Sequence, residues 1–339
     1  MTDYKKLNLI ATSSPHIRGS ETTRSIMLDV IIAMVPALVF AVINFGMRAL
    51  LLTAVSVIGC VFFEWLYRVL LKKPQCVGDL SAVVTGMLLA LTCPVTLDYW
   101  AILIGDFFAI IFVKQLFGGI GKNFINPALG GRAALVASYA GSMTKWIDPA
   151  ANKAVVLGSN VDVITAATPM AYLKGGDIEG LKAAYSVTDV FMGTIGGSMG
   201  EVSAIALLLG GAYLIWRKVI NWQTPVAYIG TVAVLSFLFP KAGSGIEWML
   251  YSVFGGGLML GAIFMATDYA TSPVTKPGQL VFGLGCGLLT VFIRRFGSYP
   301  EGVCYSILVM NCCTWLLDKY IKPTIYGAPK KEKKEAAAK

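Results

Sequence analysis

The sequence predicts an all-α polytopic membrane protein with about ten transmembrane helices, arranged as two inverted five-helix repeats with short or broken helices. Of its 339 residues, 56% are hydrophobic and 14% are charged, whereas soluble domains have about 25% charged residues. Apolar runs near the length of about 20 residues that crosses a bilayer follow one another along the chain. A weak similarity between the two halves predicts the repeats.

Ten apolar runs are predicted as helices. Several are short or interrupted by glycine, which is typical of bent or re-entrant helices covered by protein rather than lipid; "GDLSAVVTGMLLALTCP" and "NPALGGRAALVASYAG" are the clearest cases. In chain order the predicted helices are 27–45, 49–70, 78–93, 98–116, 125–141, 201–218, 222–240, 247–267, 278–295 and 301–318.

The predicted repeats are residues 26–141 and 201–320. "TGMLLALTCPVT" (85–96) parallels "LGAIFMATDYATSPVT" (260–275), and "IIFVKQLFGGIG" parallels "LTVFIRRFGSYP". Five spans per repeat is an odd number, so the second repeat is inverted, as in transporters whose broken helices form a site at the bilayer midplane. Chance similarity among apolar segments is the alternative.

Basic residues predict the orientation, because short cytoplasmic loops collect them. Nineteen of the 28 Lys and Arg residues lie in segments on the same predicted side of the membrane as the N-terminus, and eight lie on the opposite side. The remaining one, Arg132, lies within a predicted span. Both the leader (1–25) and the basic tail (321–339) are therefore predicted to be cytoplasmic, without a cleavable signal peptide, and the long loop 142–200 external. This explains the net charge of +9 better than nucleic-acid binding does.

Metal centres find no support in the sequence. The seven cysteines form no CxxC pair, and His16 is the only histidine. Ionisable residues inside spans usually face protein or a cavity, and Glu64 is expected to pair with Arg68 four residues later on the same helix. The other candidates are Asp29, Asp79, Asp106 and Arg132, with Asp189 and Glu201 beside a glycine-rich, re-entrant candidate segment.

"VDVITAATPM" (161–170) is the most distinctive polar stretch. Thr168 before Pro169 fits the start of a helix, with threonine as N-cap and proline as first helical residue. That interpretation leaves Asp162, Thr165 and Ala167 unexplained. The small residues around Thr168 also suggest an accessible hydroxyl that an enzyme modifies.

The stretch resembles the Dxx[ST]xAT recognition sequence of the bacterial flavin transferase. "SPHIR", "GKNFINPALGGRAAL", "MATDYATSPVT" and "IRRFGSYPEGVCYSILVMN" follow in the order found in the family of Rnf complex D subunits, which is related to the B subunits of the sodium-pumping NADH:quinone reductase. The resemblance extends from Ser14 to about Lys322, and the short leader favours the Rnf branch. Many relatives have Ser-Gly where Thr165 and Ala166 stand, and both fit the recognition sequence.

The resemblance implies an electron-relay subunit in a complex of the bacterial or archaeal inner membrane. That complex couples electron exchange between ferredoxin and NAD to Na+ or H+ translocation, and other subunits bind ferredoxin and NAD. FMN would be attached to Thr168 by a phosphoester bond, and Asp162, Thr165 and Ala167 would serve recognition by the flavin transferase. The implied partners are other Rnf subunits, this transferase and membrane lipid.

Two further assignments concern cofactor contacts. Asn123, Asn126 and Arg132 near a short-helix start are candidates for a second, non-covalent flavin such as riboflavin, or for a phosphate. Arg294 and Arg295 oppose the charge rule and are candidates for contact with a flavin phosphate. The competing hypotheses are a stand-alone channel or transporter with a urea-channel-like fold and no flavin, and a structural membrane subunit without cofactor.

Overall fold

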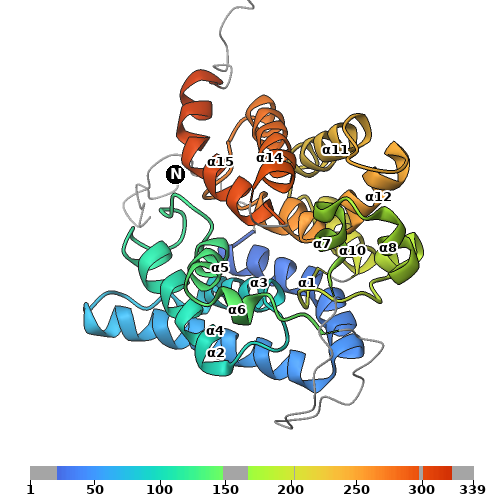
Figure 1. Ribbon diagram of the computed structural model, residues 1–339. Coiled ribbons are helices and arrows are strands. Elements are labelled where there is room, and N and C mark those ends of the chain that lie inside the picture. Colours follow the sequence, from blue (N-terminus) through green and yellow to red (C-terminus); the bar gives the residue numbers. More distant parts are fainter. Residues whose placement is uncertain (1–20, 148–166, 202, 298–300, 323–339) are drawn as a thin grey trace, which may run out of the picture.

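Helices form the regular elements of the protein in its computed structural model (Figure 1), which describes residues 21–147, 167–201, 203–297 and 301–322. Each of the ten predicted ranges contains helix within these residues. The predicted leader and tail lie almost wholly outside the described residues. Asp162 and Thr165 also lie outside them.

The first half of the chain begins with two long helices, α1 and α2, joined at Gly46. Thr22 caps α1 through a reciprocal pair of hydrogen bonds with Ser25, which satisfies the first free amides of the helix. The helices of this half are α1 (Thr23–Phe45), α2 (Met47–Leu70), η2 (Val77–Asp79), α3 (Ser81–Leu91), α4 (Tyr99–Phe107) with its π-helical continuation η3 (Phe108–Gln115), α5 (Pro127–Ser138) and α6 (Ala140–Met143).

The second half starts with three short helices and continues with longer ones. The short helices are α7 (Pro169–Gly175), α8 (Ile178–Ala184) and α9 (Val187–Met192). They are followed by α10 (Ala204–Trp216), α11 (Gln223–Leu238), α12 (Gly245–Phe254), α13 (Leu258–Leu260) with the π-helix η4 (Gly261–Met265), α14 (Lys276–Phe296) and α15 (Val303–Tyr320).

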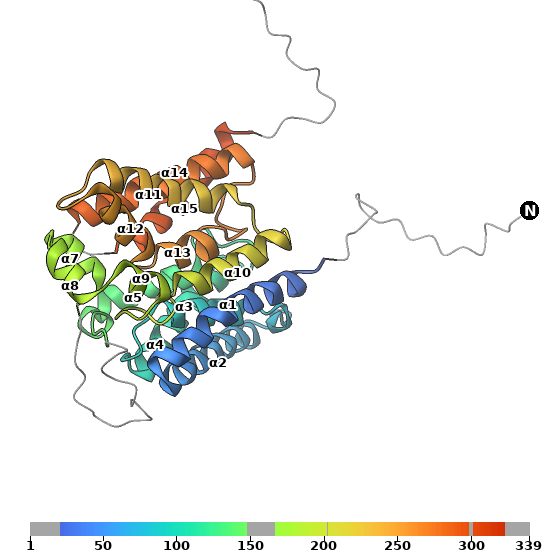
Figure 2. The ribbon, with the colours of Figure 1, turned by 90° about the vertical axis from the view of Figure 1, so that its right-hand side faces the viewer.

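The two halves pack against each other along several helices. In Figure 1, α1 to α6 fill the lower part of the view and α11 to α15 the upper part, and α1 packs against α10 while α5 packs against α15. Figure 2 shows α7 and α8 at one end of the helices and the beginning of α1 at the other. Residues at the N-terminus of α7 therefore lie at the end of the molecule opposite Thr23.

Three described helices, α1, α2 and α14, are long and apolar enough to cross a membrane by themselves. The predicted continuous span 247–267 is wrong in one respect, because α12 and the helix from Leu258 to Met265 meet at a bend of 61°. The break falls at Gly255–Gly257, where Gly256 has φ +69°, a conformation that disfavours residues with a side chain. Composition stays apolar through the break, so hydropathy alone did not reveal it.

The predicted pair of Glu64 and Arg68 is also wrong. Glu64 accepts hydrogen bonds from Lys114 Nζ (3.0 Å) and from Gln115 Nε2 (2.6 Å). Arg68 instead donates to the carbonyl of Pro74 (2.6 Å). Glu64 is fully buried, and a buried carboxylate needs a close cation and further donors. Helix η3 supplies both through Lys114 and Gln115. Glu64 therefore pairs with a residue of another helix rather than with Arg68 on its own helix.

The glycine-rich segment 194–201 packs against the end of α3. The amides of Met199 and Gly200 donate to the carbonyls of Cys93 (3.2 Å) and Leu91 (2.7 Å) at the end of α3. These bonds satisfy carbonyls that the last turn of a helix leaves free. Asp189 lies before this segment and closes a capping box on α9, where two hydrogen bonds from Ser186 lower its pKa.

The crossing of α1 and α10 depends on Gly210. A Cβ atom there would overlap the backbone carbonyl oxygen of Ala33, which is part of α1 and does not move freely. We expect Gly210→Ala to lower the free energy of unfolding by about 1–3 kcal/mol, because overpacking shifts one helix. The control is Gly230→Ala in α11, where a Cβ meets nothing within 4 Å. Thermal unfolding in detergent measures both, and equal midpoints would contradict the close contact.

Candidate functional site

Thr168 is the N-cap of α7. Its Oγ1 accepts a hydrogen bond from the amide of Ala171 (3.3 Å), and Pro169 is the first helical residue. The helix-start interpretation of this sequence is therefore confirmed. The expected accessible hydroxyl is not found in this conformation, because Thr168 is only 8% exposed. The neighbouring Ala167 is exposed.

Thr168 borders a small void beneath the start of α7. Backbone of the glycine-rich segment, Gly256 and the carboxylate residues Glu201 and Glu301 complete the lining. The void measures about 10 Å³, which is room for about one water molecule. The hydroxyl-bearing residue thus lies close to two acidic residues from distant parts of the chain.

Arg132 holds these acidic residues together. Its Nη1 donates to Glu201 Oε1 (2.8 Å) and its Nη2 donates to Glu301 Oε2. Ser198 donates to the other oxygen of Glu201 (2.9 Å). Arg132 and Glu201 are both at least nine-tenths buried, so this ion cluster joins α5 of the first half to the chain before α10 and α15.

The sequence predicted part of this cluster and missed part of it. Arg132 and Glu201 were singled out as ionisable residues in or beside apolar segments, but as separate features. Glu301 and Ser198 were not singled out. The signal for Glu301 is an acidic residue at the start of an apolar helix, which is too common to indicate a partner 169 residues away.

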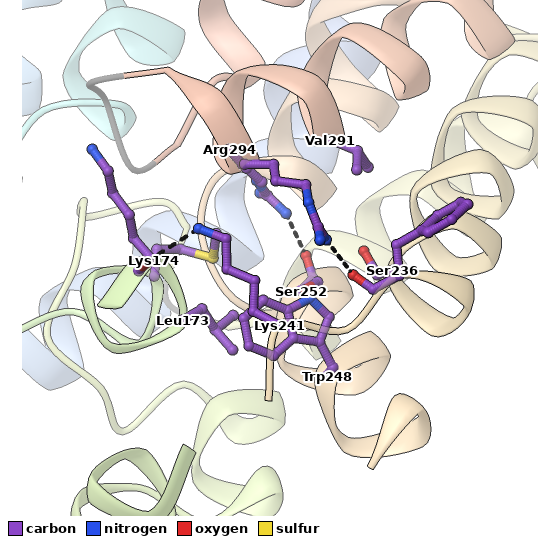
Figure 3. A pocket seen from close by; sticks show the side chains of 11 residues that line it. Leu173, Lys174, Ser236, Lys241, Trp248, Ser252, Val291 and Arg294 are labelled. Atoms are coloured by element: carbon purple, nitrogen blue, oxygen red, sulfur yellow. Dashed lines mark hydrogen bonds between the residues drawn. The ribbon is translucent and has the colours of Figure 1, made fainter. Parts of the chain in front are cut away.

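Arg294 and Arg295 lie at the C-terminal end of α14 and line a second cavity of about 40 Å³ (Figure 3), called here the Arg294 pocket. Its other walls are Met170, Leu173 and Lys174 of α7, and Ser236, Phe239, Lys241, Trp248, Ser252 and Val291. Arg294 is 9% exposed, and its Nη1 donates to the carbonyl of Ser252 (2.7 Å). Its Nε and Nη2 are buried and have no hydrogen-bond partner among the residues that the structure describes.

Asn123 and Asn126 line a third and larger cavity between the two halves, near the start of α1. It measures about 350 Å³ and is also lined by Lys114, Asp268 and Tyr269. Asn126 uses its side-chain oxygen to cap α5 at the amides of Ala128 (3.0 Å) and Leu129 (3.4 Å). The predicted grouping with Arg132 is not observed, because Arg132 lies in the ion cluster and not on this cavity.

The remaining acidic candidates in the helices have identifiable partners. Asp29 accepts from Tyr213 (2.8 Å) and from Arg217. Asp106 accepts from Ser56 (2.6 Å) through one oxygen, while its Oδ2 is buried without a partner. Asp79 accepts from Ser81. These contacts give polar partners to the buried Asp29 and Asp106 and to the half-buried Asp79, and they assign ion transport to none of the three.

Comparison with known proteins places this geometry in context. The sequence profile of the NQR2, RnfD, RnfE family matches residues 10–327. The chain is 48% identical over 335 residues to the D subunit of the Na(+)-translocating ferredoxin:NAD(+) oxidoreductase complex of Acetobacterium woodii, covering 98% of this chain and 99% of the relative. It is 43% identical to the D subunit of the proton-translocating ferredoxin:NAD(+) oxidoreductase complex of Clostridium ljungdahlii (95% and 97% covered). The D subunit of the ion-translocating oxidoreductase complex of Actinobacillus succinogenes is 35% identical (93% and 97% covered).

Proposed function

Because this chain belongs to the NQR2, RnfD, RnfE family, we propose that it is a membrane subunit of an ion-translocating ferredoxin:NAD oxidoreductase complex and carries FMN on Thr168. The observation that supports the flavin most directly is the sequence from Asp162 to Thr168, which fits the flavin-transferase recognition pattern in a chain of this family. In this proposal, Asp162, Thr165 and Ala167 serve recognition by the transferase. The chain acts as an electron relay, and other subunits bind ferredoxin and NAD.

The attachment step has a simple chemical balance. Thr168 Oγ1 attacks the FMN phosphorus of FAD, the pyrophosphate bond breaks, AMP leaves and the hydroxyl proton is lost. The product is a phosphodiester that no longer dissociates. Bound FMN would supply the redox chemistry, and the protein supplies its position and surroundings.

The present packing of α7 limits how the flavin is accommodated. The void beside Thr168 has room for about one water molecule, so a flavin does not fit beneath α7 as it is packed here. We infer that residues 167–175 move away from Gly256 and Glu201 before or during attachment. Short helices with few buried side chains open at low free-energy cost, and α7 buries only Pro169, Met170 and Leu173.

The charges around Thr168 suit a phosphodiester after such a movement. The ion cluster brings one guanidinium, Arg132, and two carboxylates. Arg294, which has no ion-pair partner in the described part of the chain, adds a second guanidinium on the other side of Met170. Because Arg132 pairs with Glu201 and Glu301, their negative charges are compensated and repel the phosphodiester less. Arg294 and Arg295 remain candidates for contact with the phosphate, as their position at the same end of the molecule permits.

A second, non-covalent flavin such as riboflavin is proposed for the cavity at Asn123 and Asn126. Its 350 Å³ give room for roughly 25 water molecules at about 10–15 Å³ each. The lining combines apolar side chains with amide, hydroxyl and charged groups, as small-molecule sites do. Mass spectrometry of the non-covalent fraction released by denaturation tests this, and the absence of any flavin in that fraction from the intact complex would contradict it.

We propose that the Thr168 end faces outward and the beginning of α14 faces the cytoplasm, because basic residues favour the cytoplasmic side. Lys145 and Lys276 are exposed residues suited to a test. A cysteine at Lys145 is expected to react with an impermeant thiol reagent in intact cells. A cysteine at Lys276 is the control, expected to react only after lysis. The reverse pattern would overturn the orientation.

The proposed function is tested by flavin fluorescence of the denatured chain on a gel, with protein from cells that make the flavin transferase. Fluorescence that survives denaturation and depends on the transferase supports the electron relay. A chain without covalent flavin from such cells would favour the alternatives, a stand-alone channel or transporter or a structural subunit. The cavity between the halves and the break at Gly255–Gly257 are compatible with those alternatives too, so fold alone does not decide.

A further inference from the structure

The Arg294 pocket contains buried positive charge without a matching negative group. In the described part of the chain, Arg294 donates to one neutral partner, the Ser252 carbonyl, and its other two nitrogens are buried without a hydrogen-bond partner. Arg295 donates to the carbonyl of Phe239 (2.7 Å) and Lys241 to that of Lys174 (3.3 Å). Within residues 21–147, 167–201, 203–297 and 301–322, no ion pair involves Arg294, Arg295 or Lys241.

Such an arrangement predicts an anionic ligand. A buried cation without a counter-ion is costly, and an anion that accepts hydrogen bonds from its free N–H groups removes much of that cost. The nearest acidic cluster does not fill this role, because Glu201 and Glu301 already bind Arg132. The cavity of about 40 Å³ has room for roughly three water molecules, which is comparable to a tetrahedral phosphate group.

The surroundings of the pocket favour a membrane lipid as the source of this anion. The pocket lies where α11 ends and α14 ends, and exposed aromatic side chains occur at these ends: Phe239, Phe292 and Phe296 are 57%, 60% and 70% exposed. Exposed apolar side chains on a membrane protein face lipid or another membrane subunit. Thr168, in contrast, faces the void at Glu201 and Glu301, and Met170 lies between that void and the Arg294 pocket.

We propose that the Arg294 pocket binds the phosphodiester headgroup of an anionic membrane phospholipid. In this site the guanidinium of Arg294 donates to the phosphate oxygens, while Lys241 and Arg295, which also line the pocket, add positive charge. Trp248 and Phe239 cover the glycerol region, and the acyl chains follow the apolar ends of α11 and α14. This pocket is a different cavity from the void at Thr168, but a lipid headgroup here would compete with any contact between Arg294 and the flavin phosphate.

The test is a lipid titration of the delipidated full-length chain in detergent, followed by native mass spectrometry. The probes are dioleoylphosphatidylglycerol and, with identical tails but no net charge, dioleoylphosphatidylcholine. The unaltered chain is expected to bind one phosphatidylglycerol in preference. Arg294→Gln is expected to weaken this binding more than about tenfold, as loss of a buried charge partner does. Lys145→Gln removes an exposed charge that does not line the pocket, and it is expected to leave the binding unchanged.

Two further variants keep the test decisive. If Arg294→Gln lowers the yield of folded protein, the double variant Lys241→Gln with Arg295→Gln is expected to weaken phosphatidylglycerol binding in the same direction. Equal binding by Arg294→Gln and the unaltered chain would overturn the proposal. Binding that appears only in Thr168→Val would also overturn it, because the flavin phosphodiester would then occupy the pocket.

Discussion

Thr168→Val is expected to remove covalent flavin from the chain completely and to stop electron flow from ferredoxin to NAD through the assembled complex. Valine has the shape of threonine but no hydroxyl, so no phosphoester forms. The substitution also removes the N-cap of α7, which costs about 1 kcal/mol. The accessible hydroxyl suggested by the sequence would have implied a smaller cost, but the structure buries Thr168. Flavin absorbance and ferredoxin-dependent NAD reduction by the purified complex measure the effect.

Two variants at the same position separate the cap from the attachment. Thr168→Asn keeps a capping side chain without a hydroxyl, so it is expected to restore the stability of α7 and still lack flavin. Thr168→Ser keeps both the cap and the nucleophile, so partial flavin loading is expected. Flavin retained at the unaltered level in Thr168→Asn would place the attachment at another residue.

Arg132→Gln is expected to lower the free energy of unfolding by about 3–5 kcal/mol. The substitution leaves Glu201 and Glu301 near each other without their guanidinium, and breaking a buried ion pair from one side has a cost of this size. The partial exposure of Glu301 (20% of its side chain) favours the lower end of the range. Thermal unfolding of the chain in detergent measures the loss.

The matched control is the triple variant Arg132→Gln, Glu201→Gln and Glu301→Gln, in which all three charges are removed together. Neutral amides of similar size are able to hydrogen-bond with one another, so we expect this variant to regain a large part of the stability. An Arg132→Gln variant as stable as the unaltered chain would show that the cluster does not join the two halves.

The sequence predicted the helices well because their apolar length is a local property. Hydropathy located helix in all ten ranges, including the short ones at Ser81–Leu91 and Pro127–Ser138. It missed the break at Gly255–Gly257, since glycine adds little to hydropathy and the run stays apolar. It chose Arg68 for Glu64 because helical spacing reveals only neighbours on one helix, whereas Lys114 comes from another.

At the candidate site too, local features were predictable from the sequence and contacts between distant segments were not. The pair Thr168-Pro169 is a local signal, and it correctly predicted the start of α7. The burial of Thr168 was not predictable, because Gly256, Glu201 and Glu301 reach it from other parts of the chain. The predicted orientation marked Arg294 and Arg295 as exceptions to the charge rule, whereas the cavity that they line and the buried nitrogens of Arg294 became visible only in the structure.

The mass of the peptide that contains Thr168 is the most direct test of the central claim. Protein from cells that make the flavin transferase is digested, and the fragment spanning residues 154–174 is analysed by mass spectrometry with fragmentation. We expect its mass to exceed that of the unmodified peptide by FMN minus one water, with the added mass on Thr168. An unmodified peptide from flavin-transferase-positive cells would contradict the flavin assignment and leave Thr168 as the N-cap of α7 alone.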